Sequence, residues 1–332
     1  MPPCAGRGWR AHGLCRWSGA QKSLALFRSC SHVSDASVPW RQWVPDFVLL
    51  ALLWGSSFLF MRLGAHDFGP VATAWVRVLL AALMLTPVLV WRREVGLLLL
   101  HWRKTFVVGV LSAGVPFVLY GYALLHISTG MSSILNATTP LFGALIAWYW
   151  LGDRLNASRA LGLAIGFAGV VLLASEVPGG IGFQSGGSGL AVLACLGATF
   201  FYGLAGSFTK RYLQGIPSMV TTSGSLWGAS LFLTLPALLL WPDQTPPWRA
   251  WAALGVAGFL CTALAYVLYF RLMSRTGPAR AMTVTYLIPV FANLIGIVVL
   301  DEVVTHWMLL GGLVVVAGTA LASGLVGLRA RL

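Results

Sequence analysis

The chain has 332 residues, of which 58% are hydrophobic and only 9% are charged, and its formal net charge is +13. A soluble globular domain carries about 25% charged residues, so this composition excludes a soluble protein and predicts that lipid surrounds most of the chain. The basic residues are spread between apolar runs and form no stripe with aromatic side chains. We therefore expect no nucleic-acid partner.

Residues 1 to 45 form a basic N-terminal segment that contains a single acidic residue, Asp35. Arginine and serine without acids resemble an organellar transit peptide. We favour instead a tail that is disordered or that begins at a start codon placed too far upstream, because the segment has no apolar core of a signal peptide. We expect it to take no part in the fold.

Ten apolar stretches follow, each close to the roughly 20 residues that a helix needs to cross about 30 Å of hydrocarbon. They lie near residues 46 to 63, 70 to 91, 105 to 126, 130 to 151, 159 to 176, 188 to 209, 218 to 241, 248 to 272, 279 to 300 and 306 to 326. The sequence therefore predicts an all-α integral membrane protein with ten transmembrane helices.

The segment from Gly130 to Ser175 is repeated later in the chain. A shift of 289 − 140 = 149 positions places Pro140 on Pro289 and Asp153 on Glu302. We call residues related by this shift repeat equivalents. The duplication predicts two five-helix repeats, at 46–176 and 188–326, which a Gly-rich linker at 177–187 joins and a basic C-terminus at 327–332 follows.

The distribution of basic residues predicts the orientation of the spans. Of the 22 Lys and Arg, Arg62 and Arg249 fall on one side and Arg77 within a span, which leaves 22 − 3 = 19 on the other side. That side should be the cytoplasm, with both termini, and the membrane the cell (inner) membrane. Because each repeat has five spans, an odd number, the second repeat is expected to be inverted relative to the first, an arrangement suited to alternating access.

Four segments make the chain resemble the drug/metabolite transporter superfamily, and within it the EamA-like family of ten-span carriers. The segments are WGSSFLFMRLG (54–64), WVRVLLAALMLTP (75–87), ATTPLFGALIAWYWLGDRL (137–155) and TALAYVLYFRLMSRTGPARAMTVTYLIPVFANLIGIVVLDE (262–302). The family usually has Gly-Glu after the fourth and ninth spans, where this chain has Gly152-Asp153 and Asp301-Glu302. The resemblance implies two inverted five-helix repeats and solute transport.

Arg77 is the sharpest candidate for a binding residue, because burying an arginine near the centre of a span costs about 2.5 to 3.5 kcal/mol. It could bind the carboxylate or phosphate of a solute, or it could hydrogen-bond carbonyls near a kink. Hydroxyl, amide and indole groups inside spans are further candidates, although for any single one of them interhelical hydrogen bonding is the favoured explanation. The candidates besides Arg77 are Trp54, Ser56, Tyr120, Asn136, Tyr266, Tyr286 and Asn293.

Prolines and glycines inside the spans predict where helices bend and where they pack closely. Pro140 and Pro289 match each other, as do Pro87 and Pro236, and a rocking mechanism can use such kinks as hinges. Gly162, Gly166, Gly169, Gly311 and Gly318 predict close helix packing, and they are equally compatible with a homodimer face.

We therefore predict a secondary active transporter that exports a small polar metabolite, such as an amino acid or a related compound. A multidrug efflux carrier is the alternative, because the 15 tryptophans and 17 phenylalanines could form an aromatic cavity. A membrane enzyme or a scaffold is less favoured: the chain has no HExxH, GxSxG or GxxxxGK[ST] motif, and its spans hold no carboxylate pair or His/Cys cluster. We expect no metal and no cofactor.

Overall fold

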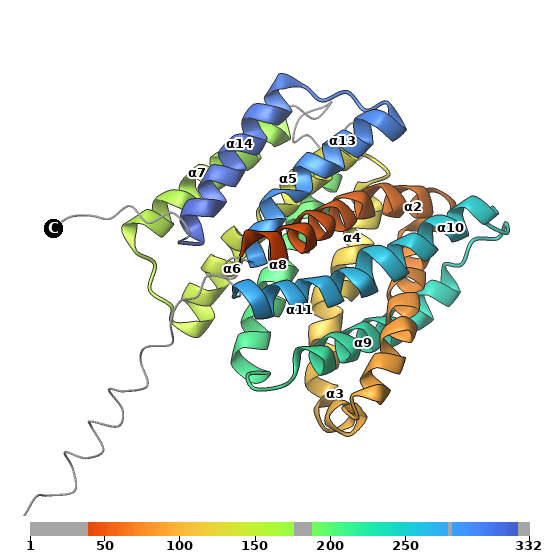
Figure 1. Cartoon of the computed structure of the whole chain (residues 1–332). Coiled ribbons are helices and arrows are strands. Elements are labelled where there is room, and N and C mark those ends of the chain that lie inside the picture. The colour runs from red at the N-terminus through yellow and green to blue at the C-terminus, as the bar shows by residue number, and fades with distance from the viewer. Residues whose placement is uncertain (1–38, 176–187, 278–280, 325–332) are drawn as a thin grey trace, which may run out of the picture. The chain divides into compact units, whose positions relative to one another are not determined.

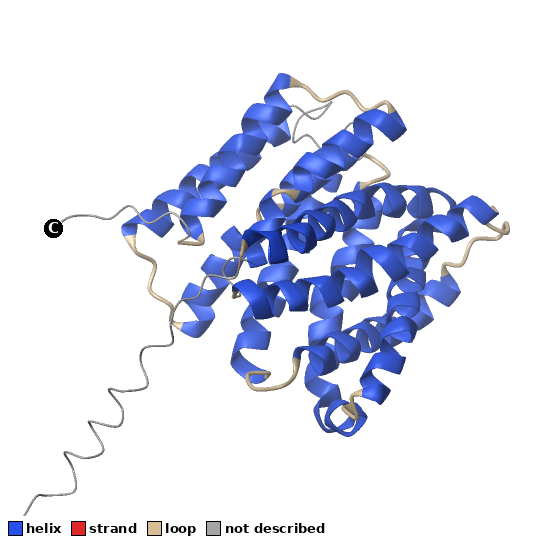
Figure 2. Ribbon diagram, viewed as in Figure 1, coloured by secondary structure: helices blue, strands red, loops and turns tan. Residues whose placement is uncertain are grey.

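The computed structural model describes residues 39–175, 188–277 and 281–324. Within these ranges the chain is helical and contains no strand, as predicted (Figure 2). The N-terminal tail as far as residue 38, the Gly-rich linker, Arg280 and the residues beyond 324 lie outside the described residues.

The elements follow the order of the expected spans (Figure 1). In the first half they are α2 (Trp40–Trp91), α3 (Val95–Gly109), α4 (Val115–Ala123), α5 (Thr129–Asn136), α6 (Thr139–Ile146) and α7 (Ala157–Ser175). In the second half they are α8 (Ser188–Tyr212), α9 (Ser218–Leu239), α10 (Trp248–Gly258), α11 (Ala265–Thr276), α13 (Ile288–Leu300) and α14 (His306–Ala322).

The first two expected spans are merged in α2, which is interrupted at Gly69 with φ 75° and ψ 165°. This backbone conformation is one that glycine adopts without steric cost, and Pro70 follows it with no N–H to donate. A straight helix of 52 residues would be about 78 Å long, more than twice the thickness of the hydrocarbon layer. The break at Gly69 therefore divides α2 into two arms of spanning length.

Two helices begin earlier in the chain than the hydropathy pattern predicts. The N-terminus of α2 is at Trp40 rather than residue 46, and that of α3 is at Val95 rather than residue 105. In each case the added residues include basic ones, such as Arg41 and Arg103, which lowered the local hydropathy. Long basic side chains at a helix end can extend to the membrane interface, so charge there does not end a helix.

The duplication extends to local irregularities of the helices. A π-helical turn at Val110–Gly114 separates α3 from α4, and another at Phe259–Leu264 separates α10 from α11; their first residues are repeat equivalents. The starts of α6 and α13 are also repeat equivalents, and so are the starts of α7 and α14. The two halves therefore interrupt their helices at matching positions here, whereas a further π-helical turn at Ala147–Leu151 corresponds to residues that are α-helical in α13.

The glycines of α7 and α14 bring these two helices into close contact. A Cβ added to Gly162 would lie 2.7 Å from the carbonyl oxygen of Gly318, and one added to Gly169 would lie 3.1 Å from that of Gly311. The early residue of one helix thus faces the late residue of the other, so α7 and α14 run antiparallel. The expected close packing of these glycines takes place within the chain.

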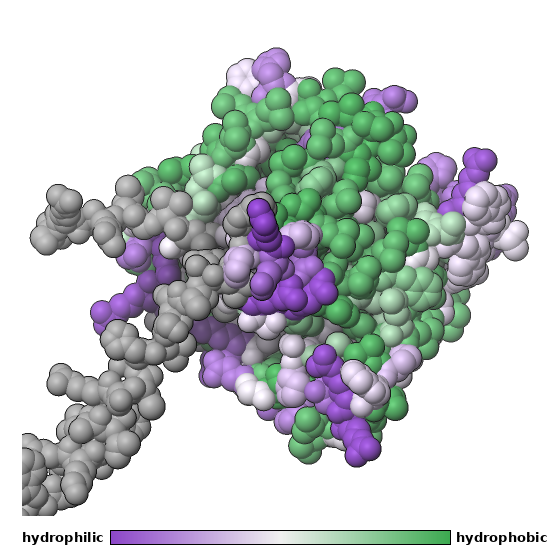
Figure 3. All heavy atoms as spheres, viewed as in Figure 1, coloured by the Kyte–Doolittle hydropathy of each residue, from purple (hydrophilic) through white to green (hydrophobic). Residues whose placement is uncertain are grey.

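Apolar surface covers the outside of the helices. The described residues include eight helices long and apolar enough to cross a membrane, with α14 as a shorter apolar helix of 17 residues. Large side chains such as Leu313, Val298 and Leu239 are 69%, 79% and 74% exposed. In the view of Figure 3 hydrophobic residues form a broad band and hydrophilic residues gather at its margins. This pattern identifies a multi-pass membrane protein.

Candidate functional site

Arg77 lies in the second arm of α2 and is only 4% exposed. Its Nε donates to Thr262 Oγ1 at 2.9 Å, and Nη1 contacts the Met61 sulfur. The guanidinium carbon lies 4.1 Å from the ring centroid of Phe117, which is a cation–π distance. Among the described residues no carboxylate forms an ion pair with Arg77.

Two tyrosines complete the surroundings of Arg77. Tyr202 of α8 and Tyr266 of α11 are close enough to interact electrostatically with the guanidinium. Phe117 and Tyr266 are repeat equivalents, so matching positions of the two halves both lie in the surroundings of this arginine, and the Phe117 ring contacts the guanidinium. Both halves of the chain therefore build the environment of this charge.

A second polar pair lies next to this group. Tyr120 is 2% exposed and donates its hydroxyl to Asn136 Oδ1 at 2.9 Å. Its ring stacks on Tyr202 with centroids 6.2 Å apart and meets the edge of Phe58 at 5.7 Å. The predicted residues Arg77, Tyr120, Asn136 and Tyr266 thus belong to one interior cluster, and Tyr202 links its two parts.

Trp54 and Ser56 lie on the neighbouring face of α2. Trp54 packs on the Tyr269 ring with centroids 5.4 Å apart. Ser56 donates to the carbonyl of Leu53 at 3.1 Å, and its hydroxyl lies 3.6 Å from the sulfur of Cys261, the residue before Thr262. Both side chains are half-buried. They border the Arg77 group without a hydrogen bond to it.

Asn293 and Tyr286 lie elsewhere. Asn293 donates to the Pro289 carbonyl at 2.8 Å, and its buried Oδ1 has no hydrogen-bond partner in the described part of the chain. A Cβ added to Gly130 would lie 2.1 Å from that oxygen, so Asn293 packs between α13 and α5. The Tyr286 hydroxyl lies 3.2 Å from Ser323 Oγ, just after α14, and is therefore engaged at a helix end.

The four prolines take two different positions. Pro87 and Pro236 lie inside α2 and α9. Pro140 and Pro289 stand in the first turns of α6 and α13, directly after the helix has been interrupted. A proline there needs no N–H partner, because N–H groups of the first turn have none within the helix. The helix is therefore interrupted before each of these two prolines and is not bent at it.

Sequence reasoning did not identify the residues that touch Arg77 most closely. Met61, Phe117 and Thr262 looked like ordinary core residues, and no spacing rule joins them to residue 77. Thr262 stands in the π-helical turn at Phe259–Leu264, and its hydroxyl also donates to the Ala257 carbonyl at 2.8 Å, five residues earlier, which the hydropathy pattern does not reveal. Such turns are frequent at functional sites.

Charged side chains near the helix ends form three clusters. Arg62 pairs with Glu302, whose carboxylate also accepts from the first turn of α5. Lys210 pairs with Asp153 at 2.8 Å. Asp46, whose side chain is 10% exposed, binds Arg271 and Arg275, which lie one turn apart in α11. Asp46 was not singled out from the sequence, and its partners were not predicted.

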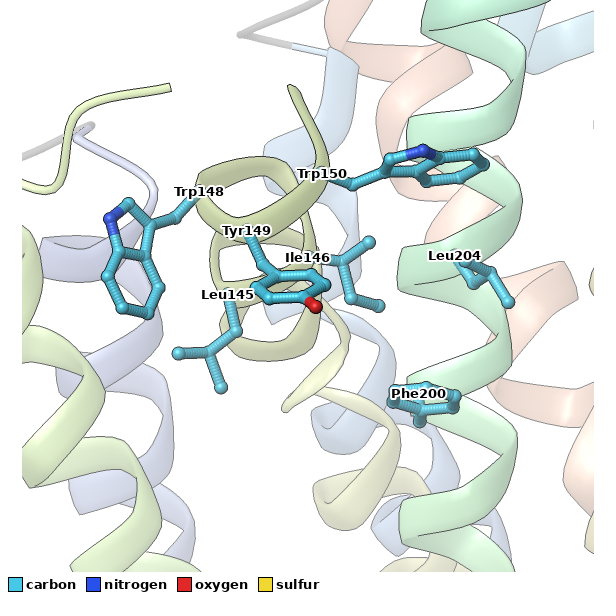
Figure 4. A pocket seen from close by; sticks show the side chains of 7 residues that line it. All are labelled: Leu145, Ile146, Trp148, Tyr149, Trp150, Phe200 and Leu204. Atoms are coloured by element: carbon cyan, nitrogen blue, oxygen red, sulfur yellow. The ribbon is translucent and has the colours of Figure 1, made fainter. Parts of the chain in front are cut away.

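An apolar pocket of about 620 Å³ lies between the end of α6 and the middle of α8 (Figure 4). Its lining is Leu145, Ile146, Trp148, Tyr149, Trp150, Phe200 and Leu204. The side chains of Trp148 and Tyr149 are 53% and 89% exposed, so the pocket opens at the surface of the helices. It contains none of the predicted site residues and is not the site of the buried arginine.

The fold and site together define a class, a multi-pass helical membrane protein with a positively charged group in its interior. The EamA-like transporter family model matches residues 43–175 and again 189–324, so the chain belongs to this family of transporters. The resemblance found in the sequence is thereby confirmed.

Several relatives align with this chain over most of their own length. The uncharacterized transporter YoaV of Bacillus subtilis is 22% identical over 275 residues, which is 82% of this chain and 93% of that protein. A protein of Streptantibioticus cattleyicolor named "Probable terminal-alkyne amino-acid exporter" is 26% identical over 283 residues, 82% of this chain and 91% of that protein.

The inner membrane transporter YedA of Escherichia coli K12 is 25% identical and covers 82% of this chain and 90% of its own length. A solved structure described as "Crystal structure of protein" superimposes with a TM-score of 0.61 at 22% identity, covering 84% of this chain and 96% of that chain. This likeness shows a shared fold.

Proposed function

We propose that the protein is a secondary active transporter that exports a small polar metabolite, an amino acid or a related compound, by alternating access. The solute site is centred on Arg77 and is formed by both halves of a ten-helix bundle with two inverted five-helix repeats, 46–176 and 188–326.

Ten spans are supported by the geometry of α2 and α14. The break at Gly69 leaves two arms of α2 that are each long enough to cross the bilayer. The 17 residues of α14 rise about 26 Å, slightly less than the hydrocarbon thickness, and its close partner α7 has 19 residues. Dividing α2 and counting α14 turns eight candidates into ten.

Inverted topology is supported by two independent observations. The helices α7 and α14, which the duplication relates, pack antiparallel through equivalent glycines. In addition, each charged cluster joins residues that the basic-residue distribution assigns to the same face: Arg62 with Glu302 outside, and Lys210 with Asp153 inside. A pair joining opposite faces would contradict the topology, and among the described residues none does.

The orientation of the protein is tested by labelling from one side of the membrane. Single cysteines at Arg154 and Val303 lie in loops that are repeat-related and should face opposite sides. The proposed topology has both termini in the cytoplasm and the protein in the inner membrane. In that case, a membrane-impermeant maleimide applied from outside should modify position 303 and not position 154. Modification of both positions from one side would contradict the inverted repeat.

The buried guanidinium of Arg77 is the observation that carries the proposed substrate class. It has a neutral hydroxyl, a sulfur and aromatic rings for neighbours, but no carboxylate among the described residues. A buried charge is stabilised by an opposite charge, so an anionic group of a solute would supply what the protein does not. The relative named as an amino-acid exporter fits a solute with a carboxylate.

Flux of radiolabelled amino acids in proteoliposomes tests this function. Arg77→Ala should abolish uptake of the transported solute, and Arg77→Lys should retain charge but lose the planar geometry, so it should raise KM at least tenfold. Arg103→Ala is the matched control, because Arg103 is exposed beside Trp102. Normal flux by both Arg77 variants, at equal yields of folded protein, would contradict the binding role.

Multidrug efflux is the second candidate, and the aromatic interior favours it. Phe58, Tyr120 and Tyr202 form a contiguous set of rings next to Arg77. The guanidinium would repel a lipophilic cation bound next to it. Arg77→Ala would then increase the efflux of such cations, not abolish it. The same proteoliposomes separate the two functions. A homodimer is left as a prediction, because the glycine face that suggested it is used by α7 and α14.

A further inference from the structure

One carboxylate holds three helices together at one end of the bundle. Glu302, two residues after α13, pairs with Arg62 of α2. Its oxygens also accept from the Thr129 N–H at 2.9 and 3.1 Å, from the Thr129 hydroxyl at 2.7 Å and from the Gly130 N–H at 3.4 Å. Only 9% of the Glu302 side chain is exposed.

These contacts complete the N-terminus of α5. The N-cap residue Ser128 accepts from the Met131 N–H at 3.1 Å, so with Glu302 the N–H groups of residues 129 to 131 are all paired. The first turn of a helix carries partial positive charge, and an anion there is stabilised. Arg62 adds a full positive charge on the other side of the same carboxylate.

Small residues let α5 and α13 approach closely beneath this carboxylate. A Cβ added to Gly296 would lie 2.4 Å from Glu302 Oε2 and 2.8 Å from the Thr129 hydroxyl. On the facing helix, a Cβ added to Gly130 would lie 2.1 Å from Asn293. The fourth and ninth spans are therefore in direct contact at this end.

The repeat equivalent of Glu302 is far less constrained. Asp153 follows α6 and its π-helical turn as Glu302 follows α13, and the backbone N–H of each bonds a carbonyl six residues earlier. In the described part of the chain the carboxylate of Asp153 pairs with Lys210 alone. Its side chain is 42% exposed and that of Lys210 54%, against 9% for Glu302.

We propose that Glu302, Arg62 and the N-terminus of α5 form the lock that closes one end of the translocation path, and that Asp153 and Lys210 are its partly formed counterpart at the other end. The inference rests on the alternating access of the proposed function. In the described state the Glu302 end is closed; transport requires that this carboxylate separate from α5 while the Asp153 end tightens. Glu302 and Arg62 are positioning residues, which set the state without touching solute.

Distances between spin labels across the Glu302 end test the lock without any solute. Labels are placed at His126 and Val303, which are exposed on the chain segments before α5 and after Glu302. The full-length protein is used with its five native cysteines replaced by alanine, in liposomes, by double electron–electron resonance. Glu302→Gln should increase the ratio of the long-distance to the short-distance population roughly tenfold or more, because the amide loses the charge that both partners bind.

Asp153→Asn is the matched control, because it removes the equivalent charge at the other end. It should leave the distances between positions 126 and 303 unchanged. The charge-swapped variant Arg62→Glu with Glu302→Arg should stay open, since an arginine at position 302 would face the positive end of α5. Unchanged distances in Glu302→Gln, equal widening in Asp153→Asn, or a closed charge-swapped variant would each overturn the proposal.

The flux assay on the same preparations separates this inference from the proposed function. If the parent protein transports none of the tested amino acids but Glu302→Gln widens the end, closure of this end by Glu302 is upheld and the proposed substrate class fails. If the parent transports normally and Glu302→Gln does so with unchanged distances, transport is upheld and the lock fails.

Discussion

The two halves of the chain share their helix breaks but differ in the side chains at their centres. The π-helical turns at Val110–Gly114 and Phe259–Leu264, the breaks before Pro140 and Pro289, and the glycine contacts of α7 and α14 recur at equivalent positions. Arg77 by contrast has Leu226, a fully apolar and buried residue, as its equivalent. The duplication therefore sets the scaffold, and divergence within it sets the charge of the site.

This difference has a physical basis. A scaffold of two related bundles needs matching helix ends and matching close approaches, because the packing surfaces are shared. A second buried arginine opposite Arg77 would add another large desolvation cost and repel the first. The interior therefore holds a single buried arginine with Phe117 of the first half and Thr262 of the second half against it, and the proposed solute site would be asymmetric.

The largest expected effect concerns glycine contacts that are equivalent by duplication but not by geometry. A Cβ added to Gly162 lies 2.4 Å from the backbone nitrogen of Ala322, whereas one added to Gly311 lies 2.7 Å from the side chain of Leu173. A side chain can rotate away and a backbone cannot. Gly162→Ala should therefore destabilise the protein by about 3 kcal/mol and Gly311→Ala by about 1 kcal/mol. Thermal unfolding of the purified variants shows which of the two substitutions destabilises the protein more.

Gly143→Ala is the control for this pair. Its added Cβ meets nothing within 4 Å, and Gly143 is inside α6. Alanine in a helix is favoured over glycine by about 0.5 to 1 kcal/mol, so this variant should be as stable as the parent or more so. Equal losses for Gly162→Ala and Gly311→Ala would show that the contact geometry of the two halves is the same after all.

The next effect compares two acidic residues that the basic-residue distribution assigns to the same side of the membrane. Asp46 is buried between Arg271 and Arg275, while Asp153 faces Lys210 in an exposed pair. Asp46→Asn leaves two arginines at a buried amide and should cost about 2 kcal/mol, a value reduced from that of a fully buried pair because both arginines are about half exposed. Asp153→Asn should cost less than about 1 kcal/mol.

Chemical denaturation of the two variants checks this difference. Arg275→Gln serves as a control, since it removes one of the two partners of Asp46 and leaves Arg271 in place. Its cost should fall between those of Asp46→Asn and Asp153→Asn. A cost for Asp153→Asn as large as that for Asp46→Asn would mean that burial of the carboxylate does not decide the strength of these pairs.

The sequence predicted the parts of the fold that depend on hydropathy and duplication. Apolar stretches located nearly every helix, and the shift that matches Pro140 with Pro289 also matches helix starts. The π-helical turns were missed, because residues 110–114 and 259–264 are as apolar as their surroundings. A change in hydrogen-bond register leaves no trace in hydropathy.

The candidate site was also predicted only in part, because the sequence reveals polar residues within spans but not the contacts between helices. Arg77 was visible because a charge in an apolar run is conspicuous, and Tyr120 and Asn136 because they are polar within spans. Phe117 and Thr262 were not visible, since their role comes from contacts between helices distant in the sequence. Tyr286 was predicted because it carries a hydroxyl within a span, which says nothing about which neighbour that hydroxyl meets.

The smallest expected effect concerns two tyrosines that are repeat equivalents. Tyr120 donates to Asn136, whereas no hydrogen bond of the Tyr269 hydroxyl is found in the described part of the chain. Tyr120→Phe should therefore destabilise the protein by about 0.6 kcal/mol, the average for an interhelical hydrogen bond, and Tyr269→Phe by less. Thermal unfolding in a double-mutant cycle with Asn136→Ala isolates the term, because the loss caused by Tyr120→Phe should disappear when Asn136 is absent. A loss that persists in the Asn136→Ala background would assign it to packing of the ring against Tyr202 and not to the hydrogen bond.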